Sequence, residues 1–336
     1  MNYSLTIFIA PIFLYFINKY LKNKSFLLNY SGDNHQNFTL EKKIPLSGGV
    51  FLFTYFIIFF SQQIYLSIFV FIIFMLGLFS DLKIFNSAKF RFFLQFIILF
   101  TFIYLTDLTL QNTKVIFIDQ ILKYKIYNYL FVLFCLLILI NGTNFIDGLN
   151  TNVLGYYIIV SFFIFQSNQE YFLLNFSNWY LWIFILIILY LFNLFNKLFI
   201  GDSGAYLLGF IYGFILIETY INSLNISPFY IITLVWYPCF EILFSIIRKF
   251  KFNQSPILPD TKHLHQLLYL SLKKRYKFSN LKANIFSASI VNLYNFFLIF
   301  IASLDVSNSQ NQLIIILINI MVYCYTYFNL FKKISI

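Results

Sequence analysis

The sequence predicts an all-α, polytopic integral membrane protein in which about eleven transmembrane helices form one bundle. Three observations predict this class: 60% of the 336 residues are hydrophobic, only 10% are charged, and the mean hydropathy is +0.79. Such a composition excludes an ordinary soluble domain. Residues 1–336 are therefore interpreted as a single transmembrane domain.

The expected spans follow the apolar runs, because a helix needs about 20 mainly apolar residues to cross a bilayer. In chain order they are residues 4–21, 46–61, 63–79, 90–106, 127–141, 153–167, 179–196, 204–221, 229–247, 284–304 and 312–331. The first run has no basic leader and no small-residue cleavage site, so we expect it to remain as the first helix. The longest polar connection is residues 248–283, expected as a loop.

The basic residues predict the orientation. With eleven spans, 20 of the 23 Lys and Arg residues fall on one side of the membrane. The cytoplasmic side of membrane proteins carries such an excess. The N-terminus is therefore predicted outside and the C-terminus in the cytoplasm, in the cell inner membrane. The same bias accounts for the net charge of +11, so no nucleic-acid partner is inferred.

Carboxylates gather at the predicted cytoplasmic helix ends. Asp81 follows the third span, Asp147 follows the fifth, and Asp202 precedes the eighth. Taken singly, such residues are also typical of helix caps and turns. Carboxylates that converge repel one another unless a cation or substrate compensates. Water-accessible carboxylates suit Mg²⁺, which is often shared with phosphate oxygens, and nearby Lys and Arg favour an anionic partner. The pattern predicts phosphate chemistry at the inner membrane surface.

Two glycine motifs accompany these acids. KIPLSGGV (residues 43–50) has a proline and paired glycines that let the backbone approach a ligand or another helix. IGDSGAYLLGF (residues 200–210) contains the GDSG of a serine-protease family, but no His–Asp partner set accompanies it and it opens a membrane helix. Asp202 is better interpreted as a helix cap or a metal ligand.

A third motif, PDTKHLHQ (residues 259–266), carries two histidines. His263 and His265 lack the ligands for structural zinc, because no cysteine is near and His35 is the only other histidine. Phosphate hydrogen bonding suits them better. The alternative interpretation is a basic loop attracted to anionic lipid.

The order of these motifs resembles that of the polyprenyl-phosphate N-acetylhexosamine-1-phosphate transferases, glycosyltransferase family 4. This family includes phospho-MurNAc-pentapeptide translocase and the undecaprenyl-phosphate GlcNAc-1-phosphate transferases. The resemblance runs from about residue 43 to residue 268, through PLSGG, GLFSDLKIFNSAKFRFFLQ, NGTNFIDGLN, GDSGAYLLG and the HLH segment. The HxH loop, with no long soluble domain, favours the GlcNAc type.

The resemblance implies a reaction and a set of site residues. UDP-HexNAc and polyprenyl (undecaprenyl) phosphate would give polyprenyl-diphospho-HexNAc and UMP, with Mg²⁺ or Mn²⁺, as the first membrane step of a cell-envelope polysaccharide pathway. Asp202 would be the metal ligand, and Asp81 and Asp147 would be catalytic. The substrate-binding residues would be Lys43, Asn141, Asn144, His263 and His265.

The chain departs from the family pattern at three positions. Ser80 stands where the family commonly has the first aspartate of a pair, Asn150 replaces a second aspartate after Asp147, and Gln266 follows the histidines. The departure at Ser80 keeps open a catalytically degenerate homologue that binds lipid phosphate without turnover.

A transporter is the other alternative. It would need acids near mid-span and a repeat between the two halves of the chain. Glu218 and Glu241 are the nearest candidates, and both lie toward span ends. The sugar, the prenyl length, the pathway and the oligomeric state, a homodimer included, stay open.

Overall fold

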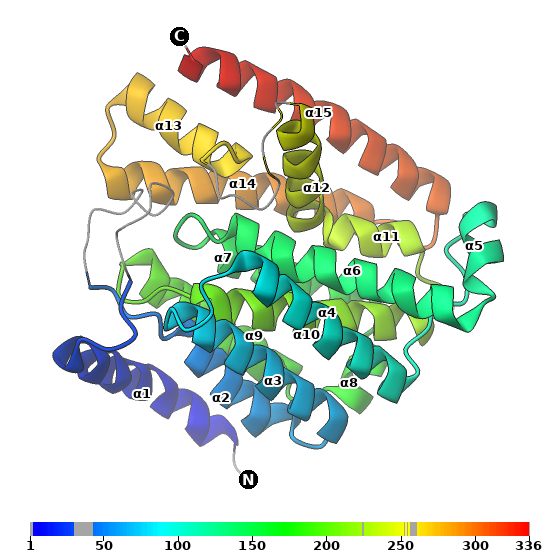
Figure 1. The fold of residues 1–336 in the computed structure, drawn as a ribbon, viewed down its shortest axis with the longest axis horizontal. Helices are drawn as coiled ribbons and strands as arrows, with labels where there is room; N and C mark the ends of the chain where they lie inside the picture. Colours follow the sequence, from blue (N-terminus) through cyan, green and yellow to red (C-terminus); the bar gives the residue numbers. More distant parts are fainter. Residues whose placement is uncertain are drawn as a thin grey trace.

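The structure is a computed structural model that describes residues 3–29, 43–223, 225–251, 253, 255 and 261–335 (Figure 1). The regular structure in these residues consists of helices, joined by turns and loops, and of one isolated bridge between Leu28 and Pro45. The all-α prediction is confirmed for this part of the chain. The helices are α1 (Tyr3–Lys24), α2 (Gly48–Phe60), α3 (Ile64–Asp81), α4 (Ala88–Thr106), α5 (Ile116–Leu122), α6 (Lys125–Ile146), α7 (Asn152–Ser167), α8 (Gln169–Asn175), α9 (Trp179–Leu194), α10 (Gly201–Ile221), α11 (Pro228–Leu234), α12 (Trp236–Lys251), α13 (Leu264–Tyr276), α14 (Asn280–Ser303) and α15 (Ser309–Ser335).

Helix α10 forms the centre of the bundle and packs against α2, α3 and α6. Glycines bring these backbones into direct contact. A Cβ added to Gly77 of α3 would lie 2.4 Å from Cα of Ser203, and one added to Gly209 would lie 2.6 Å from Cα of Ile140. Small residues allow such close approach between membrane helices. The first turn of α10, which carries Asp202, is therefore held against two neighbouring helices.

A helix lies over each of the eleven predicted spans, but not all are long enough to cross a membrane alone. Six described helices pass that test by length and apolarity, and eight spans result if each of two bent helix pairs is counted as one. Helices α2 and α7 are shorter apolar helices. The chain is therefore a multi-pass membrane protein. The number eleven and the orientation stay predictions.

The ninth predicted span, 229–247, is wrong as one continuous helix, because α11 and α12 meet at an angle of 78°. Pro238 supplies the reason: a proline removes a backbone donor and clashes with the carbonyl four residues earlier. That carbonyl belongs to Leu234, and it accepts a hydrogen bond from the Tyr156 hydroxyl at 2.8 Å instead. The break turns α12 toward the HxH segment.

Residues 248–283, expected as a polar loop, are partly helical. Helix α12 continues to Lys251, and α13 begins directly after His263. Gln266 and His263 form a capping box, in which the His263 N–H donates to Gln266 Oε1 at 3.2 Å. Reciprocal caps of this kind fix where a helix starts. The HxH histidines are thus presented at a helix N-terminus. Residues 256–260 of this segment lie outside the described residues.

Candidate active site

Asp81, the last residue of α3, caps the N-terminus of α10. Its Oδ1 accepts from the Asp202 N–H at 2.8 Å, and its Oδ2 accepts from the Ser203 N–H at 3.1 Å and from the Ser203 hydroxyl at 2.6 Å. A carboxylate there accepts hydrogen bonds from backbone N–H groups that have no partner in the helix, and its negative charge interacts favourably with the helix dipole. Gly201 has φ +72°, and a Cβ on it would lie 2.6 Å from Asp81 Oδ2, so only glycine fits. Asp81 is therefore engaged by the protein itself.

Asp202 forms an ion pair with Arg91 in the first turn of α4. Arg91 Nη1 lies 2.6 Å from Asp202 Oδ2, and the side chains are 22% and 26% exposed, respectively. The Ser80 hydroxyl also donates to Asp202 Oδ2 and accepts from Arg91 Nη1. The predicted metal ligand is thus shared by a cation and by Ser80, the residue that departs from the family pattern.

Asp147 follows α6 as its C-cap and is half-buried. Its carboxylate accepts no hydrogen bond from the described residues. Loss of water around the carboxylate raises its pKa well above the usual range, and the negative charges of Asp202 and Asp81 raise it further. The three acids from distant parts of the chain are therefore close enough to interact, and Asp147 holds a proton more readily than an exposed aspartate.

His265 lies against the glycine that follows Asp147. It is fully buried, and a Cβ added to Gly148 would lie 2.8 Å from its Nε2. Its Nδ1 lies 3.0 Å from the Tyr237 hydroxyl, whereas Nε2 has no hydrogen-bond partner among the described residues. Burial lowers the pKa of His265 to about 3, so the ring is neutral near pH 7. A buried, unpartnered ring nitrogen next to Asp147 is available to a ligand.

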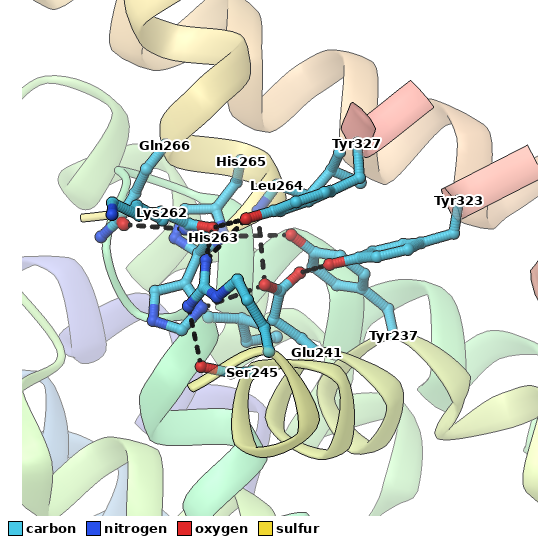
Figure 2. A network of polar contacts seen from close by, with 12 residues as sticks. Tyr237, Glu241, Ser245, Lys262, His263, Leu264, His265, Gln266, Tyr323 and Tyr327 are labelled. Atoms are coloured by element: carbon cyan, nitrogen blue, oxygen red, sulfur yellow. Dashed lines mark hydrogen bonds and ion pairs between the residues drawn. The ribbon is translucent and has the colours of Figure 1, made fainter. Parts of the chain in front are cut away.

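His263 is held by a buried carboxylate from α12, as Figure 2 shows. Glu241 Oε1 lies 3.0 Å from His263 Nδ1, and Oε2 accepts from the Tyr323 hydroxyl of α15 at 2.7 Å. The Leu264 N–H donates to the same Oε1 at 3.3 Å. Both carboxylate oxygens are thus satisfied, as burial requires. The rings of His263 and His265 are parallel, with centroids 5.8 Å apart.

The remaining predicted residues differ in their contacts. Asn141 donates to Gln95 Oε1 of α4 at 2.8 Å, so it ties α4 to α6. Asn144 lies one turn further on α6, three residues before Asp147, and makes no side-chain hydrogen bond to the described residues. Lys43 is exposed at the start of its described segment, and no contact among the described residues joins it to the three acids. The substrate roles of these residues stay predictions.

The PLSGG motif packs directly against the IGDSG motif. The Gly48 and Gly49 N–H groups donate to Phe199 O and Ile200 O, each at 3.1 Å. A Cβ on Gly49 would lie 2.2 Å from Ser203 Oγ. The packing interpretation of these glycines is confirmed, and their contacts hold the start of α10 in place.

Asn150, which replaces the family's second aspartate, has a structural position. Its Nδ2 donates to the Asn193 carbonyl at 2.8 Å, and its N–H donates to Asn284 Oδ1 at 2.7 Å. It is 2% exposed. These bonds join the loop after Asp147 to α9 and α14. Asn150 therefore stabilises this loop and is not one of the group of acids.

Sequence reasoning missed Arg91, Glu241, Tyr237 and Tyr323 as parts of this region. In the sequence, Arg91 contributes only to the excess of basic residues on one side of the membrane. Glu241 offered a signal, because a carboxylate inside an apolar run must find a partner. Its partner, His263, lies 22 residues away beyond a polar stretch, so spacing could not identify it.

The carboxylates of this region are ligands of the type that Mg²⁺ prefers, but their arrangement matches a magnesium site only in part. Among the described residues, no group of three or more His, Cys, Asp or Glu side chains is placed to hold a metal ion. Mg²⁺ needs only one or two carboxylates, because it keeps waters and shares phosphate oxygens. Asp202 is partly exposed and offers one such carboxylate. The pKa of Asp147 is raised first by burial and then by the charges of Asp202 and Asp81, which a cation would offset. Arg91 at present holds the Asp202 carboxylate.

Comparisons with known proteins agree with the motif order. The family model described as "Glycosyl transferase family 4" matches residues 63–220. The undecaprenyl-phosphate alpha-N-acetylglucosaminyl 1-phosphate transferase of Thermotoga maritima is 25% identical over 142 residues, 40% of this chain and 41% of that protein. The enzyme of the same name from Yersinia pestis is 29% identical over 157 residues, 42% of this chain and 41% of its own. The chain thus spans about two fifths of the length of these curated relatives.

Proposed function

Since residues 63–220 match glycosyl transferase family 4, we propose that the protein transfers a HexNAc-1-phosphate, GlcNAc-1-phosphate in the first instance, from a UDP-sugar to polyprenyl phosphate. The products are polyprenyl-diphospho-HexNAc and UMP. The reaction takes place at the cytoplasmic face of the inner membrane, where a water-soluble donor meets a lipid acceptor.

One observation carries this proposal: acids from three separate helix ends and the HxH segment meet at one end of the bundle. Asp81 binds the turn that carries Asp202, both charges act on Asp147, and Gly148 lies against His265. Phosphoryl transfer depends mainly on positioning and on charge placed around the phosphates. A site with acids, an arginine and a buried ring donor supplies both.

In the transfer, an oxygen of the lipid phosphate forms a bond to the β-phosphorus of the UDP-sugar. The bond from that phosphorus to the bridging oxygen breaks, and UMP leaves with the electron pair. Asp147 accepts the proton of the lipid phosphate, for which its raised pKa suits it. Asp81 is less suited, because the α10 N-terminus occupies both of its oxygens.

The HxH segment binds the diphosphate in this proposal. In the tautomer that accepts from Tyr237 at Nδ1, His265 carries its proton on Nε2, and this N–H donates a hydrogen bond to a phosphate oxygen. Glu241 orients His263 for the same substrate. Mg²⁺ held by Asp202, when bound, supplies the positive charge that a diphosphate requires.

A second candidate function is binding of polyprenyl phosphate without turnover, and the Arg91–Asp202 ion pair favours it. Arg91 and Ser80 occupy the carboxylate that the transferase needs for its metal. The transporter alternative gains no comparable support, since Glu241 is bound to the HxH segment.

UMP release separates these possibilities. The purified protein is given undecaprenyl phosphate, Mg²⁺ and a panel of UDP-sugars, and UMP is measured for the wild type, Asp202→Asn and the exposed control Asp305→Asn. The transferase predicts release with at least one UDP-HexNAc that depends on the lipid, is lost in Asp202→Asn and is kept in Asp305→Asn. Binding of the lipid with no release from any donor supports the second candidate.

A further inference from the structure

A hollow lined by lysines lies between α1 and α9, outside the candidate active site. Its volume is about 610 Å³, which falls within the roughly 300–1,000 Å³ of small-molecule sites. Lys19 and Lys22 of α1 and Lys197, just after α9, line it together with Tyr15, Leu191 and Phe195. Figure 1 shows α1 at the edge of the bundle.

The three lysines bring positive charge from two helices to one place. All three are exposed, and no ion pair within the described part of the chain involves any of them. Like charges that converge raise one another's energy unless an anion compensates. The hollow therefore offers an anion a site with three possible ammonium donors.

The other wall of the hollow is apolar. Tyr15, Leu191 and Phe195 are 56%, 47% and 65% exposed, although such side chains are costly to leave in water. In a multi-pass membrane protein, these side chains face acyl chains. A cationic end beside an apolar wall matches a ligand with an anionic head and a hydrocarbon tail.

The helix dipole explains the position of only one of the three lysines. Lys22 lies in the last turn of α1, where a cation gains about 0.3–1 kcal/mol from the helix dipole. Lys19 lies before that turn, and Lys197 lies beyond the end of α9. An excess of lysine on the cytoplasmic side explains their sign. Neither effect explains their convergence on one hollow.

The floor of the hollow is joined to the segment that leads into α10. Asn18, which is buried, donates to the Lys197 carbonyl at 3.3 Å and accepts from the Ser47 hydroxyl. Ser47 directly precedes Gly48, whose N–H donates to Phe199 O at 3.1 Å. A ligand that bridges α1 and α9 would therefore stabilise the packing of the segment that leads into α10 and its candidate site.

We propose that this hollow binds an anionic phospholipid of the surrounding bilayer, with its phosphate at Lys19, Lys22 and Lys197 and an acyl chain along Leu191 and Phe195. Basic pockets between transmembrane helices recognise anionic head groups in this way. The lipid is distinct from the acceptor of the proposed function. It joins α1 to α9, the helix against which α1 makes its main contact in the described bundle.

The test compares phosphatidylglycerol with phosphatidylcholine. The purified protein in neutral detergent receives each lipid, and bound lipid is counted by native mass spectrometry. The test variant is Lys19→Gln/Lys22→Gln/Lys197→Gln. The control, Lys273→Gln/Lys274→Gln/Lys282→Gln, removes the same charge from α13 and α14. Since a lysine near an anionic surface contributes about fivefold in affinity, the test variant should bind phosphatidylglycerol about 100-fold more weakly.

The control should bind phosphatidylglycerol as the wild type does, and both should prefer it to phosphatidylcholine. Equal binding of the two lipids, or a test variant that matches the control, would overturn the proposal. If the triple variant does not fold, Lys197→Gln alone gives the same readout, with a loss of about fivefold.

Two further arms separate this site from the proposed function. Undecaprenyl phosphate in equal amount should leave bound phosphatidylglycerol in place, whereas its displacement would assign the hollow to the acceptor lipid and reject a bilayer lipid. Asp202→Asn should lose transfer and keep phosphatidylglycerol. The lipid site and the transferase reaction can therefore fail independently.

Discussion

Arg91 Nη1 lies 2.6 Å from Asp202 Oδ2, so an arginine of α4 neutralises the carboxylate that opens α10. Ser80 completes this group by donating to the same oxygen. Where the family commonly has an acid, this chain has a hydroxyl and a neighbouring arginine. Any divalent cation at Asp202 must therefore compete with a cation that the protein already supplies.

Arg91→Gln should increase the affinity for Mg²⁺, because it removes that competitor. A partly exposed ion pair contributes up to about 1 kcal/mol, so we expect an increase of about two- to fivefold. The shift of the melting temperature with Mg²⁺ concentration measures it, and Mn²⁺ binding gives a second readout. Lys89→Gln, which changes an exposed lysine two residues earlier in the same turn of α4, is the control. Unchanged or weaker Mg²⁺ binding in Arg91→Gln would show that the arginine does not compete with the ion.

Asp81→Ala should destabilise the protein, because two N–H groups and one hydroxyl at the start of α10 lose their acceptor. Loss of a helix cap costs about 0.5–2 kcal/mol. Denaturant unfolding in detergent measures the change. Asp81→Asn, which keeps one oxygen, should lie between Ala and the wild type. A fully stable Asp81→Ala variant would mean that the capping contacts contribute nothing.

Asp147→Asn should abolish transfer and stabilise the fold at high pH. The carboxylate has a pKa raised by burial and by Asp202 and Asp81, so it favours the folded state in its protonated form. That stability is fully present below the unfolded pKa and is lost as the pH rises through the folded pKa. The melting temperature of the variant, relative to wild type, should therefore increase with pH. A difference that stays constant with pH would contradict the raised pKa.

The wild-type rate should fall as the pH drops through the raised pKa of Asp147, since a base must be deprotonated to accept a proton. His265 stays neutral over this range, because its pKa is about 3. The fall in rate at low pH should persist in His265→Gln, which would exclude that histidine as the titrating group. A rate that does not fall as the pH is lowered would reject Asp147 as the base.

Gly148→Ala should weaken binding of the UDP-sugar, because the new methyl group would meet His265 Nε2 at 2.8 Å. His265 is fully buried and has little room to move. We expect KM to rise about tenfold, in line with the 1–3 kcal/mol of overpacking. Gly213→Ala, whose new methyl group would meet the flexible ends of Leu136 and Leu139, is the matched glycine control. Equal KM values for the two variants would contradict a role for His265 at the substrate.

The sequence predicted the helices and the convergence of acids well, because both follow from local patterns and from counting which loops share a side. Asp81, Asp147 and Asp202 do meet at one end of the bundle. Sequence reasoning did not reveal which carboxylates the protein itself occupies. The capping by Asp81, the ion pair of Asp202 and the Glu241–His263 pair depend on side chains from different helices.

The broken ninth span had a local signal in Pro238. Prolines are tolerated in many membrane helices, however, when neighbours satisfy the freed carbonyl. Here Tyr156, from α7, makes that bond, and the chain turns by 78°. The size of the turn depends on a contact between distant residues, so the sequence alone did not predict it.

The most direct test of the central claim is mass spectrometry of the lipid product. The purified protein is incubated with undecaprenyl phosphate, Mg²⁺ and UDP-GlcNAc, and the lipid fraction is analysed for wild type and for folded Asp147→Asn and Asp202→Asn. The wild type should give undecaprenyl-diphospho-GlcNAc, and neither variant should give any. Equal product from Asp202→Asn and the wild type would contradict a single phosphate-transfer site at this end of the bundle.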